Sequence, residues 1–480
     1  MSKRSISLAI ILLAIAVSGV LAQDIRKYTL KECVDVALEN NLRIKRSVYA
    51  VELSRATLLQ AKGSFLPSLN AQGSYQLNYG RALNPTTNLF VDRNSTTISP
   101  SISGNLPLFQ GLRIQYNYRS SQRDVLASDH DLQKARNDIT ISVVTFYINV
   151  IFNKELLDNA RYQLNSSQQQ LERIMKQVAA GSLAMANQLN QEAIVATNEL
   201  NVINQENALN LSILQLKQAM QIPASEPLDV DVPVIPDADL VLESNAEAIY
   251  QQAMGTMPEI KAAMLRVESA NFALKASRGS YYPRLGLNAS FSSNSSDLNA
   301  RRSVTSDGTY EVGSTPVGQT VGGELVLPLN YNSQVIEEKY THGDQLADNR
   351  FRNIGLSLNI PILNGFATRT SVQRAKINQE LANITVIETR NTLRQTIESA
   401  YNDALAAVRS FHASQKQVHA QEEAFRMNKQ RFDVGSLNII ELQVSENDLY
   451  RAKSDLTRAK YNFIFRKKVL DFYQGKQIEH

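Results

Sequence analysis

The stretch "RFDVGSL" (residues 431–437) places one glycine inside a segment, residues 366–474, that contains no proline and no other glycine. The same Gly-Ser-Leu core occurs upstream in "QVAAGSL" (residues 177–183). Glycine is unfavourable inside a helix but adopts the left-handed conformation that ends one at little cost. We therefore predict that both stretches are tight turns between long antiparallel helices, and that the chain is a tandem duplication.

Two internal alignments define this duplication. "KGSFLP" at residue 62 matches "RGSYYP" at residue 278, an offset of 216, and "NLPLFQGL" at residue 105 matches "NIPILNGF" at residue 359, an offset of 254. The offset grows by 38 residues outside the predicted helices. The polar segment that begins at Ser292 predicts an exposed loop for this insertion.

Heptad patterns predict four long helices. Apolar residues recur at every seventh position, as in a left-handed coiled coil, and one step of eleven residues locally unwinds each of the two longest segments. We predict these at 112–178 and 366–432, each roughly 100 Å long at 1.5 Å per residue, and two returning helices at 184–220 and 438–474. The seam residues are Val125, Leu132, Ile139, Phe146, Leu157, Leu164, Leu171, Val178, Val195, Val202, Leu209, Leu216, Val386, Leu393, Ala400, Phe411, Val418, Phe425, Phe432, Leu442, Leu449, Leu456, Phe463 and Leu470.

Four segments alternate with period two, which marks β-strands: residues 67–80, 97–108, 284–293 and 352–361. One face of each is mostly apolar, and the other carries mainly Gly, Ser, Asn and Gln. Such strands are long enough to cross a membrane at a tilt, and a small uncharged face is compatible with a water-filled lumen. A half-buried sheet of a soluble domain is the alternative. Because four strands cannot close a barrel and an open edge is not viable in lipid, several chains would share one barrel.

The remaining segments complete the domain plan. Residues 1–22 have the form of a secretory signal peptide, with Lys3 and Arg4 before a short apolar run, an uncleaved anchor being the alternative. The two repeats occupy 23–220 and 241–475, the second opening with a helix at 243–278. A proline-rich connector at 221–240 separates them, and 476–480 is a tail. Beyond the signal we expect no apolar run of transmembrane length, so insertion into a membrane would use strands.

Composition argues against several classes of function. The 50 Lys and Arg nearly balance the 46 Asp and Glu, so no basic field favours nucleic acid. The five histidines have no metal-ligand spacing, and the single Cys33 cannot form an internal disulfide. No nucleophile with its base, phosphate loop or metal cluster stands out. We expect no enzyme activity, no cofactor and no metal.

The chain resembles the TolC family of outer-membrane efflux proteins over essentially its whole mature length. The resemblance is carried by "TLKECVDVALENNLRIK" at residue 29, "IPILNG" at residue 360 and "RFDVGSLNIIELQVSENDLYRAKSDLTRAKYNF" at residue 431. It implies a mixed fold in a homotrimer. Twelve strands, four from each chain, form a β-barrel in the outer membrane, and an α-helical coiled-coil barrel continues it into the periplasm.

The resemblance further implies a passive exit duct of a tripartite efflux or type I secretion system. An inner-membrane transporter supplies the energy, and a periplasmic adaptor protein docks at the Gly-Ser-Leu turns, unless these turns are merely structural. A general porin without an adaptor and a periplasmic coiled-coil scaffold without a pore are the alternatives. The implied adaptor contacts are Ala180, Gly181, Ser182, Leu183, Val434, Gly435, Ser436 and Leu437.

The resemblance also indicates a pore gate. Glu441 matches the first of two acidic positions that ring the pore in members similar to the founding protein, whereas the second position holds Val444. The family's tyrosine and arginine latch positions correspond to Phe432 and Leu437. A single Glu441 ring would favour cations, without a hydrogen-bonded latch. A solvated glutamate on a helix face is the alternative.

Overall fold

The computed structural model describes residues 27–84, 86–232 and 245–476. The predicted signal peptide, part of the predicted connector and most of the tail lie outside these residues. The chain divides into two units. The first, which is helical, comprises Met1–Thr57, Ser120–Asn271 and Ile377–His480, and the second, which contains the large sheet, comprises Leu58–Arg119 and Phe272–Lys376.

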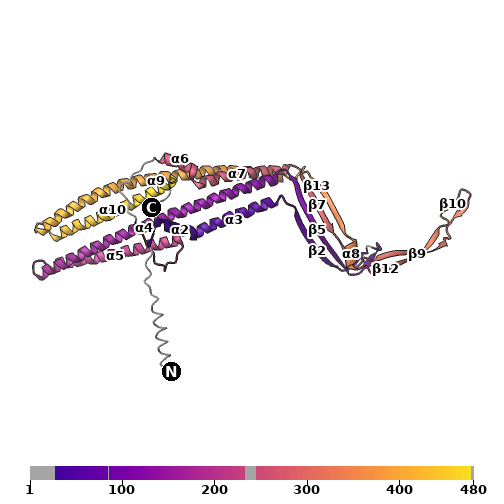
Figure 1. Cartoon of the computed structure of the whole chain (residues 1–480), viewed down its shortest axis with the longest axis horizontal. Helices are drawn as coiled ribbons and strands as arrows, with labels where there is room; N and C mark the ends of the chain where they lie inside the picture. The colour runs from indigo at the N-terminus through magenta and orange to yellow at the C-terminus, as the bar shows by residue number, and fades with distance from the viewer. Residues whose placement is uncertain (1–26, 85, 233–244, 477–480) are drawn as a thin grey trace, which may run out of the picture. The chain divides into compact units, whose positions relative to one another are not determined.

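Four long helices form two antiparallel hairpins in the first unit (Figure 1). Helix α4 (Arg113–Ala179) returns through α5 (Met185–Met220), and α9 (Ala367–Asp433) returns through α10 (Ile439–Tyr473). The ranges predicted from the heptads end within one residue of these bounds.

Most of the seam residues are buried, and the others are half-buried. Leu157, Phe411, Leu449 and Phe463 are buried, whereas Phe432, beside the second turn, is only half-buried. Leu437 and Leu442, near the same turn, are 8% and 5% exposed, so the second hairpin remains packed close to its turn.

One stretch of α4 is apolar on most of its circumference. By length and composition alone it could cross a membrane, so the prediction of no such run beyond the signal was wrong. Residues 139–151 instead supply seven buried side chains to the main core cluster of the first unit, which also contains Cys33, Leu216 and Phe463. Burial on several sides explains why this stretch lacks the usual polar face.

The shorter helices are interrupted where the sequence analysis expected continuity. The helix predicted at 243–278 is described as two, α6 (Ala246–Thr256) and α7 (Pro258–Arg278), because the residue before a proline avoids the helical conformation. In the first half, α2 (Leu30–Asn40) and α3 (Leu42–Gly63) are separated by Asn41. Asn41 and Met257 have nearly the same backbone angles and are 216 residues apart, the offset of the first alignment.

The described part of the predicted connector packs on the core. Its strand β6 (Asp229–Val230) pairs in parallel with β1 (Lys27–Tyr28). Tyr147 donates a hydrogen bond from its hydroxyl to the Asp231 carbonyl at 2.6 Å, and Lys154 pairs with the Asp229 carboxylate at 2.8 Å. These contacts hold the connector against the middle of α4.

The second unit contains an antiparallel sheet of order β13-β7-β5-β2, with the short β8 (Ser295–Ser296) also paired to β5 (Figure 1). Its long strands are β2 (Ser68–Asn78), β5 (Ser95–Gln110), β7 (Arg284–Ser292) and β13 (Phe351–Asn359). The register pairs Ala71 with Ile102, Ile102 with Phe291, and Leu287 with Leu356, so the apolar side chains share one face. The opposite face is mainly small and polar, and includes Ser74, Ser103, Ser290 and Ser357.

The prediction of four strands was incomplete. Where a polar loop was expected, β9 (Arg301–Val312) and β12 (Leu329–Glu338) form a two-stranded ribbon that carries β10 (Gly318–Gln319) and β11 (Leu325–Val326). The segment 301–338 is 38 residues long, which equals the change in offset between the two internal alignments. Helix α8 (His342–Asp348) and the hairpin of β3 (Arg81–Leu83) and β4 (Phe90–Asp92) were also not predicted.

Candidate functional site

The turn between α4 and α5 is a Schellman motif centred on Gly181. This residue has φ of 73°, and its N–H donates to the Val178 carbonyl at 2.9 Å. The Ser182 N–H and hydroxyl both donate to the Gln177 carbonyl, each at 2.9 Å. Together these bonds cap the free carbonyls at the helix end. Glycine permits the positive φ, and serine adds a second donor, which explains the Gly-Ser sequence.

The turn between α9 and α10 repeats this geometry. Gly435 has φ of 75° and donates to the Phe432 carbonyl at 2.9 Å, while the Ser436 N–H and hydroxyl donate to the Arg431 carbonyl at 2.8 and 3.0 Å. A Cβ added at Gly181 or Gly435 would meet no atom within 4 Å. Conformation, and not space, is therefore what requires glycine at both positions.

The eight predicted adaptor contacts differ in exposure. We call residues 180–183 and 434–437 the tip turns. Val434 is 79% exposed, whereas Leu437 is only 8% exposed and packs inward. Leu183 is half-buried, and the other five residues are exposed. The leucines therefore anchor the turns to their helices, and the small residues and Val434 form the accessible surface.

Glu441 has a structural task in α10. Asn438 is the N-cap of this helix, and its side-chain oxygen accepts a hydrogen bond from the Glu441 N–H at 2.9 Å. Its side-chain amide donates to the Glu441 carboxylate, also at 2.9 Å. The carboxylate remains exposed in the first turn of the helix, where the helix dipole favours a negative charge. The Asn-x-x-Glu spacing of residues 438–441 is the sequence signal for this cap.

Polar contacts join the two hairpins above the tip turns, and sequence reasoning missed them. Ser166 on α4 donates to Glu446 on α10 at 2.6 Å, and the buried Gln191 on α5 accepts from Gln443. Gln191 also donates to the Ser167 carbonyl at 3.0 Å. Towards the core, Tyr461 on α10 donates to Glu155 on α4 at 2.5 Å, and burial, then this hydrogen bond, raises the pKa of Tyr461. Heptad patterns do not reveal polar pairs between helices distant in sequence.

The large sheet exposes its apolar face. Ile354 is 80% exposed, Leu69 is 76% exposed and Leu356 is 68% exposed. An exposed apolar face of this extent on a chain marks contact with lipid or with a partner. A hollow of about 420 Å³ lies on the sheet, lined mainly by polar residues that include Gln72, Ser101 and Asn349.

The passage from strand to helix depends on a close contact of two glycines. A Cβ on Gly111, which follows β5, would lie 2.1 Å from the Gly279 carbonyl oxygen, and a Cβ on Gly279 would lie 2.5 Å from that of Gly111. Neither residue can carry a side chain there. The next residue, Leu112, also has a positive φ, of 62°.

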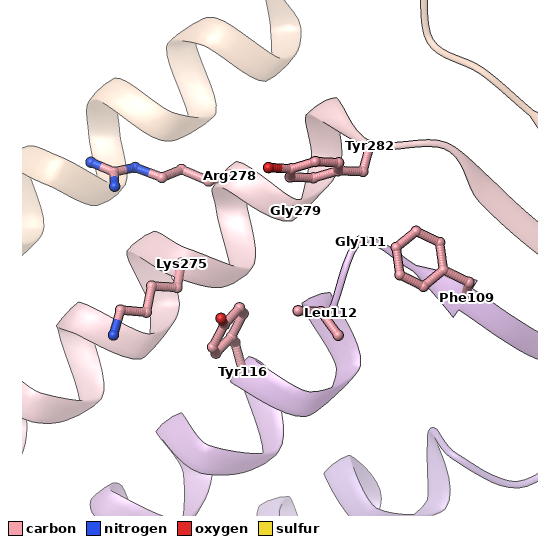
Figure 2. A pocket seen from close by; sticks show the side chains of 8 residues that line it. All are labelled: Phe109, Gly111, Leu112, Tyr116, Lys275, Arg278, Gly279 and Tyr282. Atoms are coloured by element: carbon pink, nitrogen blue, oxygen red, sulfur yellow. The ribbon is translucent and has the colours of Figure 1, made fainter.

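A cavity of about 400 Å³ adjoins this contact (Figure 2). Leu112 and the Tyr116 ring lie on its α4 side, and the cationic ends of Lys275 and Arg278 extend from α7 away from the glycine pair. No set of polar groups converges in this cavity, so its chemistry does not favour a ligand. Among the described residues, no three His, Cys, Asp or Glu side chains gather as a metal site.

The comparisons with known proteins agree with this architecture. The family model described as "Outer membrane efflux protein" matches residues 33–220 and 249–466, which include both strand pairs, the first hairpin and the second hairpin except the end of α10. The chain belongs to the outer membrane efflux protein family. This confirms the resemblance inferred from the sequence.

Individual members of the outer membrane efflux protein family match along most of their length. The outer membrane efflux protein BepC of Brucella suis is 22% identical over 96% of this chain and 88% of its own. The outer membrane protein TolC of Escherichia coli is 19% identical over 88% of this chain and 78% of its own. The crystal structure of VceC from Vibrio cholerae superposes with a TM-score of 0.72 at 14% identity, covering 94% of this chain and 97% of that one. The last likeness shows that the fold is shared.

Membership of the outer membrane efflux protein family sets the general role and place of the chain. The family consists of transport channels and not of enzymes. The chain is a protein of the cell outer membrane, with its helical part in the periplasm.

Proposed function

We propose that the chain forms a homotrimeric channel-tunnel, built from two tandem repeats per chain, that is the passive exit duct of a tripartite efflux or type I secretion system. The single observation that carries this proposal is the combination of ~100 Å helical hairpins with a four-stranded sheet whose apolar face is exposed. Three chains would supply twelve strands to one barrel. A closed barrel satisfies every backbone edge in lipid, which four strands alone do not.

The tip turns are the proposed docking surface for a periplasmic adaptor, which would connect the duct to an inner-membrane transporter. Each turn exposes small residues at the end of a long hairpin, and the second turn also exposes Val434. A coiled-coil partner whose own tip is complementary fits such a surface. A general porin would not need these hairpins.

In vivo photo-crosslinking tests the docking surface. A photoreactive amino acid at Val434 is expected to capture one periplasmic protein, identified by mass spectrometry as a membrane-fusion adaptor. The same amino acid at Arg390, exposed on the side of α9, is the matched control. Equal capture from both positions, or capture from neither in exporting cells, would contradict docking at the tip turns.

Glu441 is proposed as a weak selectivity ring at the mouth of the duct, and the half-buried Phe432, near the end of α9, as the gate residue. Three exposed carboxylates around one axis would disfavour anions in a narrow passage. Glu441→Gln preserves a side-chain oxygen for the Asn438 amide and removes only the charge.

Single-channel conductance in planar bilayers tests the duct and the ring together. The wild-type protein is expected to give a small, cation-selective current, and Glu441→Gln to reduce that selectivity with the trimer intact. If selectivity is unchanged, Glu441 is only a helix cap and the duct stands. A protein that is soluble without detergent and does not insert would be a periplasmic scaffold.

A further inference from the structure

We propose a specific register for the contact between neighbouring chains. Strand β13 of one chain pairs with β2 of the next so that Ser357 faces Ser74, and Gly365 lies against the neighbour's Gly63. This inference rests on the proposed trimer but goes beyond it, since a trimer is compatible with several registers. The partner is a second copy of this chain.

The chain already contains a strand pair equivalent to the proposed contact. Strands β5 and β7 pair antiparallel, with Ser103 facing Ser290, and beyond the strand ends Gly111 packs on Gly279. The offset of 254 carries β5 and Gly111 onto β13 and Gly365, and the offset of 216 carries Gly63 and β2 onto Gly279 and β7. Adding 254 to the residue numbers of β5 and subtracting 216 from those of β7 therefore converts the β5–β7 pair into a pair between the edge strands β13 and β2.

An independent pair of strands shows that the offsets preserve register. In the pairing of β2 with β5, Leu69 faces Gly104. Moving the first residue by 216 and the second by 254 gives Leu285 facing Leu358, which is the register observed between β7 and β13. The offsets give the observed partner for every residue of the β7–β13 pair. They therefore reproduce an observed register and can be used to predict the register between β13 and β2.

The two edge strands of the sheet have the backbone conformation of the internal pair but lack a partner strand on their outer sides. Strands β13 and β2 are the ends of the sheet, with one unpaired side each. A Cβ on Gly63 or Gly365 would meet nothing within 4 Å, in contrast to the pair Gly111 and Gly279. Yet Gly365 and Phe366 have φ of 58° and 63°, close to the 62° of both Gly111 and Leu112. The backbone is already shaped for a contact that the single chain does not make.

The transferred register also matches side-chain chemistry. It places apolar residues opposite apolar or small residues on the exposed face, and polar residues opposite polar ones on the other, so both faces continue across the joint. A slip by one residue would put the two faces out of phase. The predicted partners are Leu356 with Tyr75, Ser357 with Ser74, Leu358 with Gly73, Asn359 with Gln72, and Ile360 with Ala71.

Cysteine crosslinking of the full-length protein in outer-membrane preparations tests the register. All variants carry Cys33→Ser, which leaves no other thiol. Facing residues of antiparallel strands lie within the Cα distance that a disulfide requires. Ser74→Cys with Ser357→Cys is expected to give covalent dimers and trimers after oxidation. Ser103→Cys with Ser290→Cys is the matched control, which should close within one chain.

A control pair of cysteines and a measurement of trimer formation distinguish a wrong register from a wrong strand pairing. Gln72→Cys with Ser357→Cys, displaced by two residues, is expected to give no covalent species. Crosslinking of this pair in place of the first would overturn the register. No crosslink from either, in a protein that still forms conducting trimers, would overturn the pairing of β13 with β2 and leave the duct standing. Absence of trimers and conductance in the wild-type protein, which keeps Cys33, would sink the proposed function as well.

The glycine contact gives a second measurement. Gly63→Ala has free space in the isolated chain and no positive φ, but in the assembly its methyl group would meet the neighbour's Gly365 carbonyl. We expect loss of the detergent-resistant trimer. Gly255→Ala, also unobstructed and with no positive φ, should leave the trimer unchanged. Equal trimer yield in both variants would overturn the proposed glycine contact.

Discussion

At the scale of single residues, glycines perform two different tasks in this chain. Gly181 and Gly435 are needed for their left-handed backbone, and Gly279 is needed for lack of a Cβ. Gly111, with φ of 62° and no room for a Cβ, is needed for both reasons. The sequence reveals all four through its repeats, but only the structure separates the two tasks. The distinction predicts different responses to substitution by alanine.

Gly435→Ala should destabilise the second tip turn locally. Alanine in the left-handed conformation costs about 1–2 kcal/mol, and because the site is open the rest of the hairpin is unaffected. Hydrogen exchange should accelerate roughly tenfold near the turn, since each 1.4 kcal/mol is a factor of ten, with no change in the core of α4. Gly255→Ala, in a helix, should slow local exchange. Unchanged exchange at the turn would contradict the assigned strain.

Cys33 should be unreactive in the folded protein. Its side chain is fully buried, and burial, followed by the charge of Glu32, raises the pKa of the thiol from 9.0 to about 12. At pH 8 a thiol reagent should label it only after unfolding. Because the folded pKa is the higher one, the stability that the neutral thiol contributes is complete below pH 9 and declines as pH rises toward 12. Ser436→Cys in a Cys33→Ser background, exposed at the tip, should label at once. Rapid labelling of native Cys33 would refute its burial.

At the scale of elements, the heptads identify the long helices because burial repeats at every seventh residue there. Polar links are not periodic, so the contact of Gln191 with Gln443 and Ser167 could not be predicted. Gln191→Ala should destabilise the protein by about 1–3 kcal/mol, because it leaves buried groups without partners. Glu192→Ala, its exposed neighbour, is the control. Equal melting temperatures for the two variants would mean that the link contributes nothing.

The two helix breaks differ in whether a local sequence signal marks them. Pro258 directly follows the break between α6 and α7, and the preference of the preceding residue for extended backbone could have located it. The break at Asn41 has no proline, and its side-chain amide donates to the Ala219 carbonyl at 3.0 Å, a tertiary contact that no local pattern encodes. The ribbon 301–338 was missed because its strands mix polar and apolar residues without a strict period.

At the scale of the whole molecule, the duplication explains the strand order and register of the sheet but not the ribbon. The apolar and polar faces alternate as the sequence predicts because strand register follows the pleat. The ribbon interrupts this plan in the second repeat only. Its strands β9 and β12 pair with each other and with no other described strand. The rings of Tyr310 and Tyr331 pack against each other across the two strands, with their centroids 5.9 Å apart. In the proposed duct, the ribbon would therefore be an addition and not part of the wall.

This view predicts that the duct survives without the ribbon. Arg301 faces Glu338 across the strand pair, so residues 302–337 can be replaced by Asn-Gly, which closes a two-residue hairpin. The shortened chain retains the Arg301 contact with Asp348 at 3.4 Å and should form trimers with the wild-type melting temperature and single-channel conductance. Replacing residues 82–91 in the β3 and β4 hairpin in the same way is the matched comparison. A shortened chain that inserts but conducts differently would place the ribbon at the pore, and one that no longer trimerises would make it part of the assembly interface.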